Sequence, residues 1–345
     1  MKAKRARGRK QKARHSKKAR QKKATASTAS ATYGEFIGKT KYSSYEEAVL
    51  SNILEGRPIH GISTKAMLFL NSLLNLSDGT KEIVYKRGFS IGKTLYKSLE
   101  ARKHYAMYEE SVKDLAEFFE KAGLGTTTFS AFSDKAVISI YGSDKSFMGA
   151  NMHSFEAGIA SGFISAARHE YSRVSETKCM HNLSDHCELV FSKFGTSEAS
   201  VQDPKKILEN AVRSLSNGEY GNTIRYDYGA MLANSALSAV YADELKAIAY
   251  YVGNSVASSI EKGKSRLESA IAIANSVCME NVMLEKAKPL KATISATSSI
   301  TGKQAMELYA SFMQGLLPKA ARASDSKAIE INTYDFNKIK IAQAK

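Results

Sequence analysis

From residue 44 onward, apolar residues recur every three or four positions, which is the spacing of one buried helical face. In the first part of the chain this pattern predicts helices over residues 44–55, 63–76, 81–99, 111–122 and 153–168. Gly88 and Gly92 lie one turn apart within the third of these helices. Because glycine lowers helix stability, the pair predicts a place where another backbone packs closely against this helix.

The pattern changes to strand-like segments between and after these helices. Residues 126–132 and 135–141 are rich in Thr, Phe, Val and Ile and flank the short turn Ser133-Asp134, which predicts a β-hairpin. Two more strands are predicted over 173–177 and 187–193, after the last helix. Helices followed by an antiparallel sheet that carries one long helix define an α+β domain.

The second part of the chain, from Asp203-Pro204, repeats the first in a weaker form. The run Ala66–Leu74 recurs at 230–237, and the segment that ends at Gly92 recurs at 249–253. Further on, the pattern predicts a long helix containing Leu267 to Val282, a strand over 290–296, a helix over 301–317 and a strand over 328–332. We therefore expect two α+β domains, at 33–200 and 201–345, of which the second is a degenerate copy.

The charge distribution changes this picture only at the N-terminus. Thirteen Lys and Arg residues and no acid fall within residues 1–24, so the net charge of +16 leaves only +3 for the other 321 residues. A segment this basic and poor in apolar residues, over 1–32, predicts a disordered tail. The candidates for contact with nucleic-acid phosphates are Lys4, Arg5, Arg7, Arg9, Lys10, Lys17 and Lys18. The alternative is a tail that only increases solubility.

Composition and motifs argue against several classes of protein. Three cysteines give no disulfide framework, so we expect a reducing, cytoplasmic compartment. The chain has no run of about 18 apolar residues, which predicts no transmembrane helix. It also lacks a phosphate-binding loop, a nucleophile elbow and a redox-cofactor fingerprint. We therefore name no catalytic residue and rank an enzyme last among the possible functions.

Candidate metal chemistry is concentrated between residues 153 and 191, which hold two of the three Cys and four of the seven His. Glu176, Cys179 and Cys187 form the pattern E-x-x-C followed by a second Cys eight positions on. Zn²⁺ is bound in proteins by Cys sulfur, His nitrogen and carboxylate oxygen, so these residues are candidate ligands. The alternative is a pair of buried, inert thiols. Cys278 lies in a helical pattern and is expected to be such a core thiol.

The same segment resembles the 4-vinyl reductase domain family, also described as hydrocarbon-binding domains. The resemblance is carried by the glycine-punctuated helix at 158–163, the strand at 174–176, Cys179, Cys187 and the apolar strand at 189–191, and it covers Glu46 to Phe194. In zinc-bearing members the metal is held by the Glu and Cys of E-x-x-C, the Cys eight positions further on, and a Cys near the start of the preceding helix.

For this chain, the resemblance implies one Zn²⁺ held by Glu176, Cys179, Cys187 and a fourth ligand. The fourth position falls at or near His153, a departure from Cys that zinc accepts. His181 and His186 lie within the same loop and are alternatives. Two thiolates and one carboxylate leave the site at a charge of about −1, which a neighbouring donor such as Lys178 would soften.

The resemblance also implies binding of a small apolar or aromatic molecule in a pocket beside the metal. The candidate lining residues come from the long helix and the hairpin: Phe155, Ile159, Phe163, Phe129 and Phe132. The alternative is that these side chains simply fill the core. The chain has no Trp, whereas phenol-sensing members of the family carry a pocket Trp, so phenol itself is not the expected ligand.

Pairing of domains through their helices is a further implication of the resemblance. We expect the two copies to pair within one chain, with residues 84–99 and 247–260 near the shared surface, and a homodimer of chains also stays open. The expected function is a ligand-binding or sensory protein. The alternative is a nucleic-acid-associated protein in which the basic tail makes the contact and the domains serve as a dimerisation scaffold.

Overall fold

The described part of the chain forms helices and three antiparallel sheets, which confirms the predicted α+β class. The computed structural model describes residues 45–59, 61–142, 153–179, 184–195, 203–216, 223–237, 242–260, 266–278, 281–287, 290–295, 303–321, 329–333 and 338–343. These residues belong to a single compact unit that runs from Tyr42 to Lys345. The predicted tail, residues 1–32, lies outside the described residues.

The first half of this unit is the segment from Tyr45 to Ser192. Its elements are α3 (Tyr45–Leu54), β1 (Gly61–Ser63), α4 (Thr64–Leu74), α5 (Asp78–Glu100), α6 (Tyr108–Lys121), β2 (Thr126–Phe132), β3 (Lys135–Tyr141), α7 (Ser154–Arg168), β4 (Val174–Lys178) and β5 (Cys187–Ser192). The helix α5 begins three residues before its predicted start, because the Ser77 side chain accepts a hydrogen bond from the Thr80 amide and caps it.

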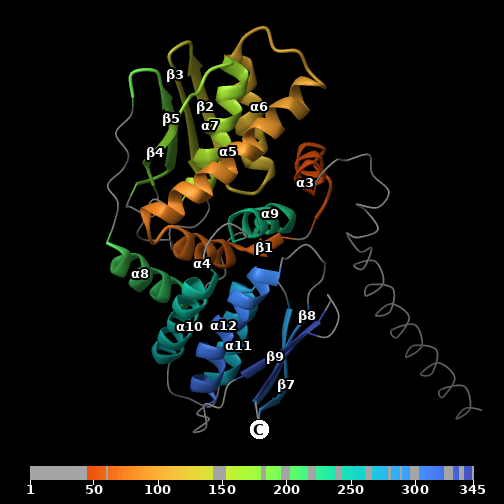
Figure 1. The fold of residues 1–345 in the computed structure, drawn as a ribbon, viewed down its shortest axis with the longest axis vertical. Helices are drawn as coiled ribbons and strands as arrows, with labels where there is room; N and C mark the ends of the chain where they lie inside the picture. The colour runs from red at the N-terminus through yellow and green to blue at the C-terminus, as the bar shows by residue number, and fades with distance from the viewer. Residues whose placement is uncertain are drawn as a thin grey trace, which may run out of the picture. The chain divides into compact units, whose positions relative to one another are not determined.

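One sheet, in the order β2-β3-β5-β4, organises the first half. The hairpin pairs Thr126 with Tyr141 and Phe132 with Lys135, at the predicted bounds. Ile138 and Leu189 lie opposite each other on the buried face of the sheet. The helix α7 packs against β4 and β5 and is covered in turn by α5, as Figure 1 shows.

The helices α5 and α7 touch through their backbones. A Cβ atom placed on Gly92 would lie 2.0 Å from the Ile159 carbonyl oxygen, and one placed on Gly162 would lie 1.9 Å from the Phe89 carbonyl oxygen. Because real Cβ atoms do not approach backbone oxygens this closely, the crossing requires glycine on both helices. The close approach predicted from Gly88 and Gly92 is confirmed, and the partner is α7.

The second half, from Pro204 to Gln343, has the same order of elements as the first. These are α8 (Pro204–Ser216), β6 (Thr223–Arg225), α9 (Tyr226–Leu237), α10 (Ala242–Ser259), α11 (Arg266–Val277), β7 (Asn281–Ala287), β8 (Leu290–Ser295), α12 (Lys303–Ala320), β9 (Ile329–Thr333) and β10 (Lys338–Gln343). Its sheet order, β7-β8-β10-β9, corresponds strand for strand to that of the first half. The glycine crossing recurs, since Gly253 faces the Phe312 carbonyl and Gly315 faces the Tyr250 carbonyl.

Two strands of the second half differ from the sequence prediction. Val282 was expected to continue the long helix, but α11 ends at Val277 and Val282 pairs with Ile294 in the hairpin of β7 and β8. The apolar residues of a short strand can coincide with helical spacing, which explains the error. The strand β10 was not predicted at all, although it pairs with both β8 and β9.

The two halves contact each other through one pair of strands and through several helices. The strands β1 and β6 pair antiparallel, with Ile62 opposite Ile224. The helix α4 packs on α8 and α11 of the second half, and α9 packs on α3 and α5 of the first. Residues 84–99 and 247–260 were expected near the shared surface. The helix α5 does contact α9, and α10 contacts α4, although α5 packs chiefly on α7 and α10 on α12.

The helices α4 and α9 are exchanged between the halves, in the sense that each packs against helices of the other half. Aromatic side chains of both helices enter the opposite half. The Phe69 ring of α4 lies 4.9 Å from the Phe312 ring of α12, centroid to centroid. In the reverse direction, the Tyr228 ring of α9 lies 6.3 Å from the Phe155 ring of α7. Both Phe69 and Tyr228 are fully buried, so each half completes part of the other's core.

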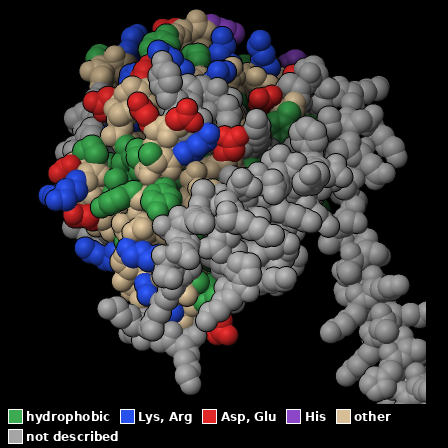
Figure 2. All heavy atoms as spheres, turned by 60° about the horizontal axis from the view of Figure 1, so that its bottom comes forward, with side chains coloured by type: hydrophobic (Ala, Val, Ile, Leu, Met, Phe, Trp, Pro, Cys, Tyr) green, Lys and Arg blue, Asp and Glu red, His purple; other side chains and the backbone are tan. Residues whose placement is uncertain are grey.

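The described surface mixes both signs of charge. Figure 2 shows acidic and basic side chains interspersed among apolar ones on one face of the molecule, in agreement with the small net charge of the chain beyond residue 24. Among the described helices, none has the length and apolar character needed to cross a membrane.

Candidate metal centre

Four potential metal ligands come together at one end of the first sheet. Ligand atoms of His153, Glu176, Cys179 and Cys187 all lie within 4.8 Å of one another. His153 precedes α7, Glu176 and Cys179 come from β4 and its end, and Cys187 begins β5. The cluster can therefore hold a metal ion, and it contains the four residues that the sequence proposed.

A bulge in β4 explains how Glu176 and Cys179 face the same side. In a regular strand, residues three positions apart point to opposite faces. Here Glu176 pairs with Leu189, but the register shifts before Lys178 pairs with Glu188. This bulge reverses the alternation of side chains, so that Lys178 faces outward while Glu176 and Cys179 are both buried.

His153 reaches the cluster because it stands at the N-cap of α7 and makes no side-chain capping bond there. Its Nδ1 atom lies 2.8 Å from the Glu176 Oε1 atom, and its backbone N–H donates to Glu176 Oε2 at 3.3 Å. The cluster thus lies at the N-terminus of a fifteen-residue helix, whose dipole favours negative charge. The dipole of this helix therefore acts in favour of the ionised thiol and carboxyl groups.

The two thiols have the separation that a shared tetrahedral ion requires. The Sγ atoms of Cys179 and Cys187 are 3.9 Å apart, and neither cysteine forms a disulfide bond. Two sulfur atoms at about 2.3 Å from one tetrahedral Zn²⁺ would be about 3.8 Å apart. Two thiols, one imidazole and one carboxylate also complete a four-ligand set, which is typical of a structural site.

The pKa values of Cys179 and His153 in this cluster are both raised well above their ordinary values. Burial raises the pKa of the Cys179 thiol well above its usual range, and the neighbouring Cys187 and Glu176 act in the same direction. Burial alone would lower the pKa of His153, but the Glu176 carboxylate and the Cys179 thiol outweigh it and raise that pKa well above the ordinary value. A metal ion would displace these protons, so binding should strengthen as pH rises.

One alternative for the fourth ligand, His186, lies in the described part of the chain. His186 is directed toward other groups: its Nδ1 atom contacts Asp185, its Nε2 atom lies 3.7 Å from Glu188, and its ring lies against Tyr141. His181 lies outside the described residues. Lys178, expected to soften the charge of the site, instead pairs with Glu188 at 3.2 Å on the outer face, and that expectation is wrong.

The predicted apolar pocket does not form from the residues proposed. Phe155, Ile159 and Phe163 are fully buried, and the Phe163 ring packs edge-on against Tyr96 of α5 at 5.3 Å. Phe129 and Phe132, expected to face them, are instead 42% and 63% exposed.

Sheet geometry explains both exposed rings. Phe132 pairs with Lys135 and therefore lies on the face opposite Ile138, while Phe129 shares the face of Ile138 but belongs to the edge strand β2.

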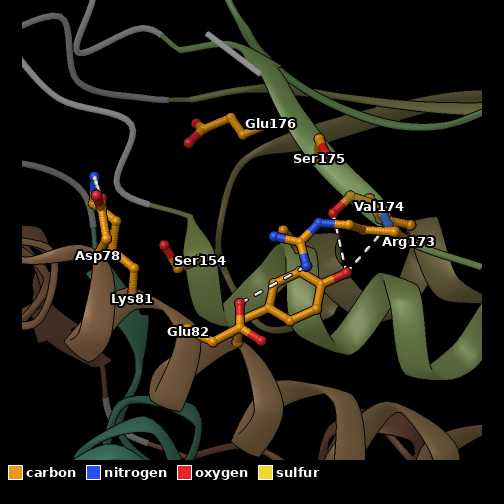
Figure 3. Close-up of a pocket in the computed structure, with 10 residues that line it drawn as sticks. Asp78, Lys81, Glu82, Ser154, Arg173, Val174, Ser175 and Glu176 are labelled. Carbon is orange, nitrogen blue, oxygen red and sulfur yellow. Dashed lines mark hydrogen bonds and ion pairs between the residues drawn. The ribbon is translucent and has the colours of Figure 1, made fainter. Parts of the chain in front are cut away.

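A polar cavity lies beside the metal cluster instead. It has a volume of about 200 Å³ and is lined by Asp78, Lys81, Glu82, Tyr85, Ser154, Ala157, Arg173, Val174, Ser175 and Glu176. Figure 3 shows these side chains converging from the first turns of α5 and α7 and from β4. Glu176 belongs to both the cavity and the cluster.

A second feature that the sequence did not indicate joins the metal region to the second half. The Tyr228 hydroxyl of α9 donates to Glu156 Oε1 at 2.8 Å, one turn after His153 along α7. The other oxygen of Glu156 is buried and has no hydrogen-bond partner. Burial raises the pKa of this carboxyl, although His153 and Tyr228 act against the shift. No spacing in the sequence relates residues this far apart.

Comparisons with known proteins neither support nor contradict the resemblance to the 4-vinyl reductase domain family. No family model, no curated protein and no solved structure matches this chain. Membership of the 4-vinyl reductase domain family therefore stays a prediction, and the candidate site is defined by its own geometry.

Proposed function

We propose that this protein is a small-molecule-binding, sensory module whose binding site is organised by one Zn²⁺ ion. The observation that carries the proposal is the buried cluster of His153, Glu176, Cys179 and Cys187 beside a polar cavity. Zinc is favoured over harder cations because two of the four ligands are thiols. A complete ligand set favours a structural role over a catalytic one.

The strand β4 carries the coupling between metal and cavity. Glu176 is a metal ligand, and the preceding residues Arg173, Val174 and Ser175 form one wall of the cavity. Fixing Glu176 and Cys179 on an ion therefore fixes the strand from which that wall is built. Ligand affinity should accordingly depend on the metal, since a preorganised site loses less freedom when it binds.

The proposal is tested with a library of small polar and apolar compounds and the full chain in two states, zinc-loaded and zinc-depleted. A ligand stabilises the folded state by mass action, so hits should raise the Tm of the zinc-loaded protein. The same hits should shift the Tm of the zinc-depleted protein much less. Equal shifts in both states would contradict the dependence on metal, and a chain purified without bound metal that also takes up none would contradict the centre itself.

We also propose, as a second function, that the N-terminal segment attaches the protein to nucleic acid. The observation in its favour is the thirteen basic and no acidic residues among the first 24. Each neutralised phosphate contributes about −0.9 to the slope of log K against log salt concentration for duplex DNA. Deleting residues 1–24 should therefore remove most of the affinity for DNA or RNA and flatten its salt dependence. Unchanged binding by the truncated chain would place the contact elsewhere.

A further inference from the structure

The strand β2 forms an open edge of the first sheet. It is the outermost strand in the order β2-β3-β5-β4, and within the described part of the chain only β3 pairs with it. Every residue of β2 is exposed or half-buried. An edge of this kind presents backbone N–H and C=O groups that can pair with a further strand.

The register of the hairpin shows which backbone groups of β2 face the open edge. Phe132 and Lys135 flank the short turn and form its closing pair, which is hydrogen-bonded in a hairpin with a two-residue loop. Hydrogen-bonded and non-hydrogen-bonded pairs alternate along an antiparallel ladder. The even-numbered residues of β2 therefore direct their backbone groups toward β3. The groups that point to the open edge are those of Thr127, Phe129 and Ala131.

The strand β2 differs from the other edges of the two four-stranded sheets because it carries no charge. The further edge strands are β4, β7 and β9. Each of them contains an acid, and β4 and β7 also contain a lysine and a bulge. Charges and bulges on an edge strand oppose pairing with another chain. The sequence of β2 is TTTFSAF and its register with β3 is regular, so both protective features are missing.

An uncharged edge strand suits a second copy of itself. Two copies of one strand always carry the same net charge, and like charges on opposing strands are destabilising. The strand β2 avoids this repulsion and offers nothing to a partner that is recognised by charge. An antiparallel register centred on Phe129 pairs all seven residues of β2 with those of the other copy. In this register the outward-pointing residues of the two copies lie opposite one another.

The hairpin is held in place by the helices beside it. The Tyr108 hydroxyl of α6 donates to the Phe132 carbonyl. The guanidinium carbon of Arg168, at the end of α7, lies 4.9 Å from the centre of the Tyr108 ring, a cation–π contact. Figure 1 shows α6 beside the hairpin, and α6 packs on β2. A strand that is already fixed in an extended form loses little freedom when it pairs.

We propose that β2 is a homodimer interface, at which two copies of this chain pair antiparallel in the register centred on Phe129 and join their four-stranded sheets into one. This two-fold contact closes the assembly at two chains. Two strands of seven residues form a small contact, which predicts a weak, reversible dimer. The inference goes beyond the proposed function and does not depend on the metal.

The experiment is analytical ultracentrifugation of the full chain over a range of concentrations. The wild type should show only monomer and dimer, with a Kd below about 100 µM. Thr128 and Ser130 are exposed, and Thr128 would lie opposite Ser130 of the second copy. In Thr128→Lys/Ser130→Lys, lysines of the two copies would therefore face each other. The Kd should rise by at least about 10-fold, because like charges directly opposite are destabilising.

The matched control is Thr128→Lys/Ser130→Glu, which carries as many new charges but places each lysine opposite a glutamate of the other copy. Opposite charges in such a pair are favourable, so this variant should dimerise at least about 10-fold more tightly than the two-lysine variant. Thermal unfolding should show both variants folded, since the two positions are exposed.

Three results would overturn the proposal. The first is a wild-type chain that stays monomeric throughout, which would leave the edge for another strand or for none. The second is equal dimerisation by the two double variants, which would place the contact away from β2 or in another register. The third is growth into larger assemblies with rising concentration, which a closed two-fold contact does not allow.

Discussion

The two halves of the molecule share an architecture and differ in chemistry. Both have the same element order and sheet order, and in both, glycines on two long helices bring the helix backbones into contact. The metal cluster belongs to the first half, whereas residues 201–345 contain no His and a single Cys. That cysteine, Cys278, is buried at the end of α11, as expected for a core thiol.

The two halves differ most clearly in the segment that connects their last two strands. In the first half it spans residues 179–186 and carries Cys179, and in the second half it spans only residues 334–337. The strand after the connection begins with Cys187 in one case and Lys338 in the other. Because the second half reaches the same topology without these ligands, a metal bound at the cluster would not be needed to specify the fold. Its effect should be local, unlike that in zinc fingers, which are unfolded without metal.

The largest expected effect comes from removing the thiols. Cys179→Ser/Cys187→Ser should lower metal affinity by more than about 100-fold, since even residues that only support a ligand contribute 10- to 100-fold. Metal analysis measures the loss, and hydrogen exchange should show faster opening of β4 and β5 with α10 and α12 unchanged. Cys278→Ser is the control and should retain the metal. Unfolding of the whole double variant would contradict a local role.

A smaller effect, similar in the two halves, is expected at the glycine crossings. In Gly92→Ala the new Cβ atom would meet the Ile159 carbonyl at 2.0 Å, and in Gly253→Ala it would meet the Phe312 carbonyl at the same distance. Each substitution should destabilise the protein by about 3 kcal/mol, at the upper end of overpacking effects. Denaturant unfolding measures this change in the free energy of unfolding.

The matched control for these variants is Gly79→Ala, in the first turn of α5. A Cβ atom there would meet only the Ser77 hydroxyl, at 4.0 Å. Alanine should be neutral or should stabilise the protein by about 0.5–1 kcal/mol. If Gly92→Ala changed the free energy of unfolding as little as Gly79→Ala does, the backbone contact at Gly92 would not require glycine. The two crossings would then not be equivalent.

The smallest effect is expected at the contact between the halves. Tyr228→Phe leaves the buried Glu156 carboxyl without its hydrogen-bond donor, which should cost about 1–3 kcal/mol of stability. A surface control is Tyr251→Phe, because the Tyr251 side chain is exposed. Equal and negligible changes in both variants, measured by thermal or denaturant unfolding, would show that the cross-half hydrogen bond contributes nothing.

Glu156 also predicts a pH dependence of stability. Burial raises its pKa above the ordinary value of 4.5, so the folded chain keeps a proton that the unfolded chain releases. Stability from this group is complete below pH 4.5 and is lost as pH rises through the raised pKa. Relative to wild type, Glu156→Gln should gain stability over this range. A constant difference between the two proteins across the range would argue against a raised pKa.

Local sequence patterns were sufficient to predict most of the helices and strands and three of the four residues of the metal cluster. The bounds of β2 and β3 were predicted without error, because a hairpin is defined by its own residues. Glu176, Cys179 and Cys187 were likewise visible as a short spacing. The bulge that turns Glu176 and Cys179 to one face depends on pairing with β5, and a single strand's sequence does not reveal it. His153 entered only through a family resemblance.

What the sequence missed depends on long-range packing. The exchange of α4 and α9 between the halves follows from how Phe69 and Tyr228 fit the opposite cores. The polar cavity is lined by both Lys81 and Arg173, which lie far apart in the chain. Phe132 looked suited to a pocket by composition, but the pairing with Lys135 turns it to the other face.

The central claim, that one half holds a metal and its copy does not, is tested most directly by native mass spectrometry of the full chain. We predict one zinc ion per chain, with protons displaced from the Cys179 and Cys187 thiols. The same measurement on Cys179→Ser/Cys187→Ser should give a metal-free chain. A wild-type chain without zinc, or stoichiometric zinc retained by the double variant, would contradict the account.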